Sequence, residues 1–418
     1  MTRVALLSSE PIRNRMAGIG IRYLELARRL PAYGIDVVLV SPAEPGETRE
    51  LGGLSGVDVR SFERGRLASI LGDCDAAVAQ GQLANDLVLE MPGLPAAIDL
   101  YDPWLVEHFA YRETLGLDPY RNDHATWALQ MSRGDFFLCS SEEQRSFYLG
   151  FLTALGRVNP ERIADDSDLA TLIAPVPFGV PDELPPHRPV LPARTAGERR
   201  LLFGGLYDWY DPWTLLDALT SLDRPGWTLL LIRNPNPEGT PQRLFGEVEA
   251  RCRSLGWWGS RVQALDWVPS ERRYDLLRDV DLLVSPHKPT LETRLSLRTR
   301  FLDALAAGCP VVTSEGGAMS RMLAERRAGW VVPPGDAPAL ARALTEALDD
   351  PASRQAGARE LAAAFQWDRV LEPLVRFCRE PWIDPTKERF AQRPATVAPA
   401  DSLAFRLRRR LRIWRGAS

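Results

Sequence analysis

Charged and hydroxyl side chains are concentrated between positions 285 and 317. They are Lys288, Glu292, Arg294, Ser296, Arg298, Arg300 and Asp303. The cations come just before the helical pattern of Phe301, Leu302 and Leu305, so we expect them at a helix N-terminus. The free N–H groups there also attract negative charge. This combination suits a phosphate-like anion. A solvated loop and first helical turn would have the same composition, and this second reading stays open.

Short apolar runs of strand type flank these charges. VDLLV precedes them and PVVTS follows them, which predicts a strand, a helix and a second strand of one parallel sheet. Ligands of parallel sheets bind beyond the carboxyl ends of the strands. We therefore expect the loop from His287 to Leu297 to face a binding site.

The beginning of the chain has a second candidate for anion binding. VALLSS predicts a buried strand, and a helix is expected from Ile21 to Leu30. Gly18 and Gly20 stand just before that helix, where the backbone can approach a ligand oxygen closely. The loop lacks the third glycine and the acidic residue of a dinucleotide fingerprint. As an isolated signal, Gly-x-Gly before a helix more often reflects simple turn chemistry.

Polar and aromatic residues follow another predicted strand, in the run AAIDLYDPWLVEHF. Asp102 and His108 are candidates for contact with a hydroxylated ligand. The alternative is structural, with Asp102 as a helix N-cap and Pro103 at the first helical position.

One segment of the sequence resembles a known family. The tract LDALAAGCPVVTSEGG resembles the donor-site segment of retaining family-4 glycosyltransferases of GT-B fold. The run from Glu292 to Asp303 is similar to a bacterial branch with the pattern E-T-R-x-S-x-R-T-R-x-L-D. The family usually has two glutamates separated by seven residues, and here Leu295 and Asp303 take those places. Glu292, one helical turn earlier, is the alternative source of the first carboxylate.

The resemblance implies an α/β protein of GT-B fold, with two Rossmann-like domains whose parallel sheets face each other across a cleft. A Pro-rich stretch near mid-chain agrees with this division. The expected parts are an acceptor domain (1–182), a linker (183–199), a donor domain (200–368), a helix that returns to the first domain (369–390) and a Pro/Ala linker with a basic tail (391–418).

The resemblance also implies a reaction, the transfer of a sugar from a nucleoside diphosphate sugar to an acceptor hydroxyl with retention and without a metal or other cofactor. The acceptor would be a glycan, a lipid-linked glycan or a small molecule. The expected pathway is the synthesis of cell-surface polysaccharide, lipid-linked glycan or a glycosylated natural product. Two alternatives remain, a GT-B epimerase or phosphorylase, and a non-catalytic nucleotide-sugar-binding subunit. The second is motivated by Leu295 and by the lack of Arg and Lys between Gly204 and Thr214.

Site roles follow from the same resemblance. Arg298 and Arg233 would bind phosphate above Gly18 and Gly20, Asp303 would bind the ribose and Glu292 the sugar. The predicted catalytic residues are Arg298, Glu292, Asp102 and His108. The predicted donor-binding residues are Gly18, Gly20, Gly204, Gly205, Trp209, Arg233, Trp267, Val268, Ser296, Arg300, Asp303 and Gly316. Trp267 and Val268 would contact the base.

Composition sets further bounds. A net charge of -4 over 418 residues argues against a nucleic-acid partner. The five cysteines are far apart, which suits a reducing cytoplasm. The sequence has no run of about 18 apolar residues, so no membrane-spanning helix is expected. Residues 403–415 combine six arginines with leucines and a tryptophan, so we expect a basic amphipathic helix that contacts the inner face of the membrane. A helix docked on the protein or a disordered tail is the alternative.

Overall fold

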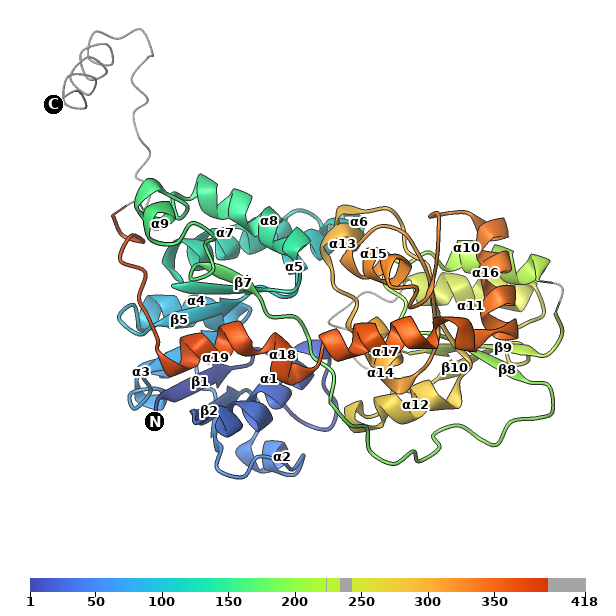
Figure 1. The fold of residues 1–418 in the computed structure, drawn as a ribbon, viewed down its shortest axis with the longest axis horizontal. Coiled ribbons are helices and arrows are strands. Elements are labelled where there is room, and N and C mark those ends of the chain that lie inside the picture. The colour runs from blue at the N-terminus through green and yellow to red at the C-terminus, as the bar shows by residue number, and fades with distance from the viewer. Residues whose placement is uncertain (223, 234–242, 390–418) are drawn as a thin grey trace, which may run out of the picture.

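The structure, a computed structural model, describes residues 1–222, 224–233 and 243–389. Two parallel sheets, each covered by helices, lie side by side (Figure 1). The first sheet has the strand order β3-β2-β1-β4-β5-β6-β7 and the second the order β10-β9-β8-β11-β12-β13. The chain therefore forms two α/β halves, as its two series of alternating strands and helices predict.

The strands of the first sheet are β1 (Arg3–Leu7), β2 (Asp36–Ser41), β3 (Asp58–Ser61), β4 (Ala76–Ala79), β5 (Ala96–Asp99), β6 (Phe136–Cys139) and β7 (Ile173–Pro175). Those of the second sheet are β8 (Arg199–Phe203), β9 (Trp227–Ile232), β10 (Val262–Leu265), β11 (Leu282–Ser285), β12 (Val311–Ser314) and β13 (Trp330–Val332). Central strands such as β4 and β6 are buried along their whole length. Parallel strands covered by helices on both faces need such continuous apolar runs.

Helices of the first half are α1 (Gly18–Arg29), α2 (Pro45–Arg49), α3 (Leu67–Ile70), α4 (Gln82–Glu90), α5 (Trp104–Glu107), α6 (Arg112–Leu115), α7 (Asp118–Arg133), α8 (Glu142–Ala154) and α9 (Pro160–Asp165). Those that follow are α10 (Pro212–Ser221), α11 (Arg243–Ser254), α12 (Arg273–Asp279), α13 (Leu291–Leu295), α14 (Thr299–Ala307), α15 (Ala318–Glu325), α16 (Ala337–Asp349), α17 (Gln355–Ala364), α18 (Trp367–Val370) and α19 (Glu372–Arg379). Short 3-10 turns occur at η1 (Leu30–Tyr33), η2 (His108–Tyr111), η3 (Ser270–Arg272) and η4 (Pro351–Arg354).

Three predicted helix boundaries are wrong. Helix α1 begins at Gly18, so Gly18 and Gly20 lie in its first turn and not in a preceding loop. The expected loop from His287 to Leu297 contains helix α13, which Thr290 caps. Asp102 is not an N-cap, because Pro103 takes that position before α5.

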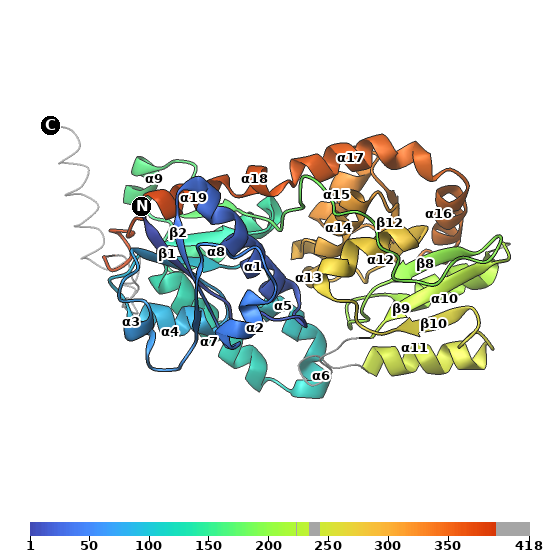
Figure 2. The same ribbon diagram turned by 90° about the horizontal axis from the view of Figure 1, so that it is seen from below.

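The end of the described chain returns to the first domain. From α17, which lies on the second half, helices α18 and α19 continue onto the first half and lie near α1 and β1 in the two views (Figures 1 and 2). The ring of Phe377 stacks on Phe136 with centroids 5.5 Å apart. The first domain is thus completed by residues from the far end of the sequence.

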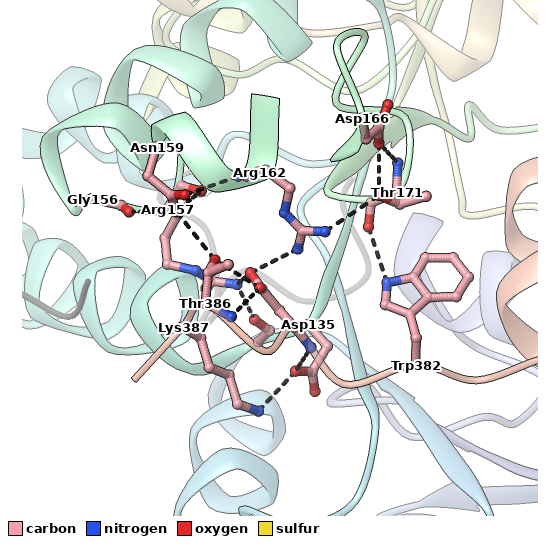
Figure 3. A network of polar contacts seen from close by, with 12 residues as sticks. Asp135, Gly156, Arg157, Asn159, Arg162, Asp166, Thr171, Trp382, Thr386 and Lys387 are labelled. Carbon is pink, nitrogen blue, oxygen red and sulfur yellow. Dashed lines mark hydrogen bonds and ion pairs between the residues drawn. The ribbon is translucent and has the colours of Figure 1, made fainter. Parts of the chain in front are cut away.

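Residues 382–387 are fastened to the first domain by a buried polar network (Figure 3). The Asp384 carboxylate accepts from Arg157 at 2.7 Å and also lies 2.7 Å from Arg162. Lys387 donates to Asp135 at 2.8 Å. Burial acts to raise the pKa of Asp384, but the hydrogen bond from Arg157 and the two positive charges lower it below its ordinary value.

The linker after β7 is bound to the second half. Asp279 of α12 accepts from the backbone N–H groups of Val190 and Leu191 at 2.6 and 2.9 Å. Just before this linker, the chain contacts the segment between α17 and α18 that leads back to the first domain. Val180 donates to the Phe365 carbonyl at 2.8 Å and accepts from the Trp367 N–H at 3.1 Å. The two connections between the halves therefore meet at one place.

No helix among the described residues is long and apolar enough to cross a bilayer. The basic segment 403–415 lies outside the described residues.

Candidate functional site

A cavity of about 290 Å³ lies between the carboxyl ends of the two sheets. Its polar lining residues are Tyr101, Asp102 and Glu107 from the first domain, and Tyr207, Tyr210, Ser270, Arg273, Ser285, Ser296, Arg298, Thr299, Arg300 and Asp303 from the second; Gly18 of the first domain also lines it. Parallel sheets bind ligands at this end, because loops and helix N-termini gather there. The cavity is the candidate site.

Arg298 faces the cavity but is already paired. Its Nη1 and Nη2 donate to the two carboxylate oxygens of Glu292 at 2.7 and 2.6 Å. Burial opposes the charge of Arg298, yet the Glu292 carboxylate outweighs it and raises the pKa of the guanidinium. Glu292 itself lines a neighbouring cavity of about 470 Å³, together with Trp209 and Lys288. The ion pair thus forms a wall between two cavities.

Arg300 has no carboxylate within ion-pair distance among the described residues. It lies in the first turn of α14, and its Nη1 is 3.4 Å from the Tyr210 hydroxyl. Gly204 lies directly against the guanidinium, since a Cβ built there would stand 2.0 Å from Nη1 and 2.4 Å from Cζ. Only glycine leaves room for Arg300 in this position. A guanidinium without an acidic partner beside a helix N-terminus is suited to an anion.

The N-terminus of α1 is occupied by a side chain of the protein itself. The Glu10 carboxylate accepts from the N–H groups of Ala17 and Gly20, the latter at 2.7 Å. Burial raises the pKa of Glu10 while these two hydrogen bonds oppose the shift. Gly18 lines the cavity and Gly20 does not. A phosphate beneath both glycines, as predicted, would compete with Glu10.

The opposite wall is largely apolar. Trp267 and Val268 line it, where the sequence predicts contact with a base. Asp303 lies at its edge and is held by Arg273, with 3.1 Å between Oδ1 and Nε. A flat apolar wall beside a carboxylate can accommodate an aromatic base and its ribose.

Two carboxyl groups of the first domain face this cavity. Asp102 follows β5, and Glu107 is the last residue of α5. Burial and then the charge of Asp102 raise the pKa of Glu107 well above its ordinary value. Burial also raises the pKa of Asp102.

Other predicted site residues lie elsewhere. His108 bonds to Asp123 outside the cavity. Trp209 stacks on Tyr207 with ring centroids 5.0 Å apart, as a packing residue would. The Arg233 guanidinium lies 5.6 Å from the Phe245 ring centroid.

Besides Gly20, the predicted glycines Gly204, Gly205 and Gly316 are absent from the lining of the cavity. Gly205 lies beside the Tyr207 ring. The Gly316 N–H donates to the Ser320 hydroxyl at 3.1 Å. Leu295, in the place of the family's first glutamate, is buried in the core with 6% of its surface exposed.

Sequence reasoning missed Glu10, Glu107, Arg273 and Tyr210 as neighbours of the site. Glu107 gives a weak signal, because it lies five residues after Asp102 in the same run. The other three reach the site from elements whose relative placement only the folded structure defines.

Fold and site together define a two-domain protein of GT-B fold, the predicted fold class. Two solved structures are similar over nearly their whole length. Sucrose-phosphate synthase from Thermosynechococcus elongatus has 17% identity and a TM-score of 0.63, covering 91% of this chain and 99% of the other. HepE from Anabaena, solved in complex with UDP, has 16% identity and a TM-score of 0.62, covering 91% and 100%. At these identities the similarity establishes the fold.

Sequence comparisons place the second half of the chain near a family of enzymes. Residues 198–350 match the family described as glycosyl transferases group 1. D-inositol 3-phosphate glycosyltransferase from Jonesia denitrificans is 29% identical over 238 residues, which are 54% of this chain and 53% of the relative. The chain thus matches about half the length of this relative. Within the described ranges, no group of His, Cys, Asp or Glu side chains is arranged to hold a metal ion.

Proposed function

We propose that this protein is a glycosyltransferase that moves a sugar from a nucleoside diphosphate sugar to an acceptor hydroxyl with retention of configuration. The observation that carries the proposal is the Arg300 guanidinium in the cavity between the sheets, which has no acidic partner among the described residues. It lies on α14, in the half similar to group 1 glycosyltransferases. The HepE structure with UDP supports a nucleotide in a cleft of this fold.

The cavity suggests where each part of the donor binds. The base would lie against Trp267 and Val268, and the ribose beside Asp303. The diphosphate would lie between Arg300 and Gly18, near the N-terminus of α14. In this arrangement Arg300 takes the phosphate role predicted for Arg233, which is outside the cavity.

Charge stabilisation is the main catalytic task in this proposal. As the bond between the anomeric carbon and the diphosphate breaks, negative charge grows on the phosphate oxygens. Arg300 and Arg298 stabilise that charge from fixed positions. The leaving phosphate takes the proton of the acceptor hydroxyl on the same face of the sugar, so no protein nucleophile and no metal are required.

Glu292 would act on the sugar through its contact with Arg298. The two side chains are held together at 2.6 Å, so a sugar that extends past Arg298 into the neighbouring cavity, which Glu292 lines, meets the Glu292 carboxylate. A carboxylate accepts hydrogen bonds from sugar hydroxyls. This assigns to Glu292 the role that buried Leu295 cannot perform.

A cytoplasmic location at the inner face of the membrane, within the synthesis of cell-surface polysaccharide or lipid-linked glycan, is part of the proposal. It rests on the arginine-rich composition of residues 403–415. The relative named for D-inositol 3-phosphate suggests including that compound among the acceptors tested.

A donor panel tests the function. Purified protein is titrated with UDP-, GDP- and dTDP-sugars, and binding is followed by thermal shift. The sugars that bind are then assayed for transfer to methyl glycosides and to D-inositol 3-phosphate. One base series should bind and turn over. Binding without any transfer or donor hydrolysis would instead favour a non-catalytic subunit, and binding of none would refute the proposal.

A further inference from the structure

Tyr101 follows β5 and is not among the assigned donor contacts. Its side chain lines the cavity between the sheets and is more than nine-tenths buried, with 8% of its surface exposed. Among the described residues, no group forms a hydrogen bond with its hydroxyl. Buried hydroxyl groups normally have a partner. An unpartnered hydroxyl in the wall of a cavity therefore indicates that a bound molecule supplies one.

The hydroxyl end of the Tyr101 ring lies beside Gly18, in the first turn of α1. A Cβ built at Gly18 would stand 3.0 Å from the Tyr101 hydroxyl oxygen, so glycine at this position leaves room for the hydroxyl. Gly18 lines the same cavity, and so does Arg300 from the other domain. The Tyr101 hydroxyl thus lies at the part of the cavity where Gly18 and Arg300 would enclose the diphosphate.

A buried ion pair holds the Tyr101 ring in this position. The guanidinium carbon of Arg22 lies 4.7 Å from the ring centroid. Arg22 donates from Nε to the Asp99 carboxylate at 2.6 Å, and neither of these side chains is exposed. It also donates to the carbonyl oxygens of Val176 at 2.8 Å and Pro177 at 3.1 Å. Since Arg22 is fully buried and makes these hydrogen bonds within the protein, it fixes the ring and does not reach a ligand.

The phenol of Tyr101 keeps its proton. Burial and then the charge of Asp102 raise its pKa well above the ordinary value, while Arg22 acts in the opposite direction. A neutral phenol can donate one hydrogen bond, and phosphate oxygens accept such bonds. A hydrogen bond to a charged acceptor is stronger than one between neutral groups. A phosphate oxygen beside Gly18 therefore suits this hydroxyl well.

We propose that Tyr101 is a first-domain ligand of the donor, whose hydroxyl donates to a diphosphate oxygen beside Gly18, and that Arg22 is a positioning residue for its ring. This inference rests on the proposed glycosyl transfer and deepens it. The diphosphate then bridges the two domains, with Arg300 on one side and Tyr101 on the other.

The Y101F variant separates ligand binding from folding. Because the hydroxyl has no partner within the protein, its removal should leave the melting temperature of the ligand-free protein unchanged or slightly raise it. Binding of UDP, GDP and dTDP is measured by calorimetry. The nucleotide that binds the wild type should bind Y101F roughly tenfold more weakly or worse, as expected for one hydrogen bond to a charged group. Y120F is the matched control, since Tyr120 is 39% exposed and its ring packs on Phe109.

Ligands of different length locate the contact. The loss in Y101F should be the same for the nucleoside diphosphate and for the nucleotide sugar, and it should be absent for the nucleoside alone. A loss confined to the nucleotide sugar would assign the hydroxyl to the sugar and overturn the diphosphate contact.

A double variant tests the positioning role of Arg22. R22K should weaken nucleotide binding through displacement of the Tyr101 ring, and R22K/Y101F should bind no more weakly than Y101F. Additive losses would overturn this role. Should R22K not fold, Y101F alone still decides the diphosphate contact.

The outcomes for Y101F distinguish this inference from the proposed function. Wild-type nucleotide affinity of Y101F would overturn the role of Tyr101 and leave glycosyl transfer intact. A lower melting temperature of ligand-free Y101F would show that the hydroxyl has a partner within the protein, which also overturns that role. If the wild type binds none of the three nucleotides, the proposed function fails and the role of Tyr101 fails with it.

Discussion

The close contact between Gly204 and Arg300 makes a sharp prediction about donor binding. A Cβ at position 204 would lie 2.0 Å from Nη1, 2.4 Å from Cζ and 2.8 Å from Nε of Arg300. Heavy atoms cannot approach so closely, so the G204A change must displace the guanidinium. The backbone of Gly204 can accept alanine, because its φ is not in the left-handed region. The expected loss is therefore that of one charged contact and not of the fold.

A hydrogen bond to a charged group contributes about 1.5–3 kcal/mol. Since about 1.4 kcal/mol corresponds to a factor of ten, donor affinity should fall roughly 10- to 150-fold. The dissociation constant of the nucleotide sugar is measured by calorimetry, with kcat/KM determined in parallel. Gly205 provides the matched control, because a Cβ there would meet Tyr207 at 3.4 Å, an ordinary contact. G205A should bind the donor like the wild type.

A double-mutant cycle separates displacement of Arg300 from general damage. R300A should lose as much affinity as G204A, and the double variant G204A/R300A should be no weaker than R300A alone, since both changes remove the same interaction. If G204A binds the donor with wild-type affinity, or if the two losses add, Arg300 is not the diphosphate ligand that we propose.

Three further predictions concern other parts of the chain. R298A should raise the activation free energy for kcat/KM by more than about 2 kcal/mol, which lowers kcat/KM roughly 30-fold, because it removes a transition-state contact and leaves Glu292 buried without its partner. Unchanged turnover would exclude Arg298 from the site. D384N should destabilise the protein by about 3–5 kcal/mol in chemical denaturation at pH 7, because Arg157 and Arg162 lose a buried counter-charge. The lowered pKa of Asp384 means that its stabilisation is complete above about pH 4 and is lost as the pH falls further. The variant should therefore lose less stability than the wild type on acidification, and equal pH dependence would contradict the role of Asp384. Removal of the residues after Pro399 should move the protein from the membrane to the soluble fraction of a lysate, whereas an unaltered distribution would exclude the basic segment as a membrane contact.

Local patterns in the sequence predicted the parts of the fold that depend on local interactions. An Asp followed within two residues by Pro is a helix-start signal that occurs at Asp211 and Asp336, and each of these carboxylates accepts from the N–H group three residues later. Continuous apolar runs predicted buried parallel strands, because helices cover both faces of such a sheet. The candidate site lies at the carboxyl ends of the strands, where parallel sheets bind their ligands.

Contacts between distant segments were not predictable in this way. The Glu10 carboxylate reaches the N–H groups at the start of α1, which begins at Gly18, only because the loop between them folds back. The sequence assigned similar phosphate roles to Arg298 and Arg233. The structure distinguishes them from Arg300 by their neighbours, a carboxylate for Arg298 and a phenyl ring for Arg233. Neither neighbour could be identified from spacing alone.

The place where Val180 bonds to Phe365 and Trp367 limits how the two halves can move. Gly179 also packs there, since a Cβ on it would lie 2.3 Å from the Trp367 ring. Both covalent crossings between the domains are tied together at this point, so it acts as a pivot. Rotation of one half relative to the other about this point would keep the backbone pairing and would change the gap most at the residues farthest from it. Sliding of one half along the other would break the backbone pairing and is disfavoured.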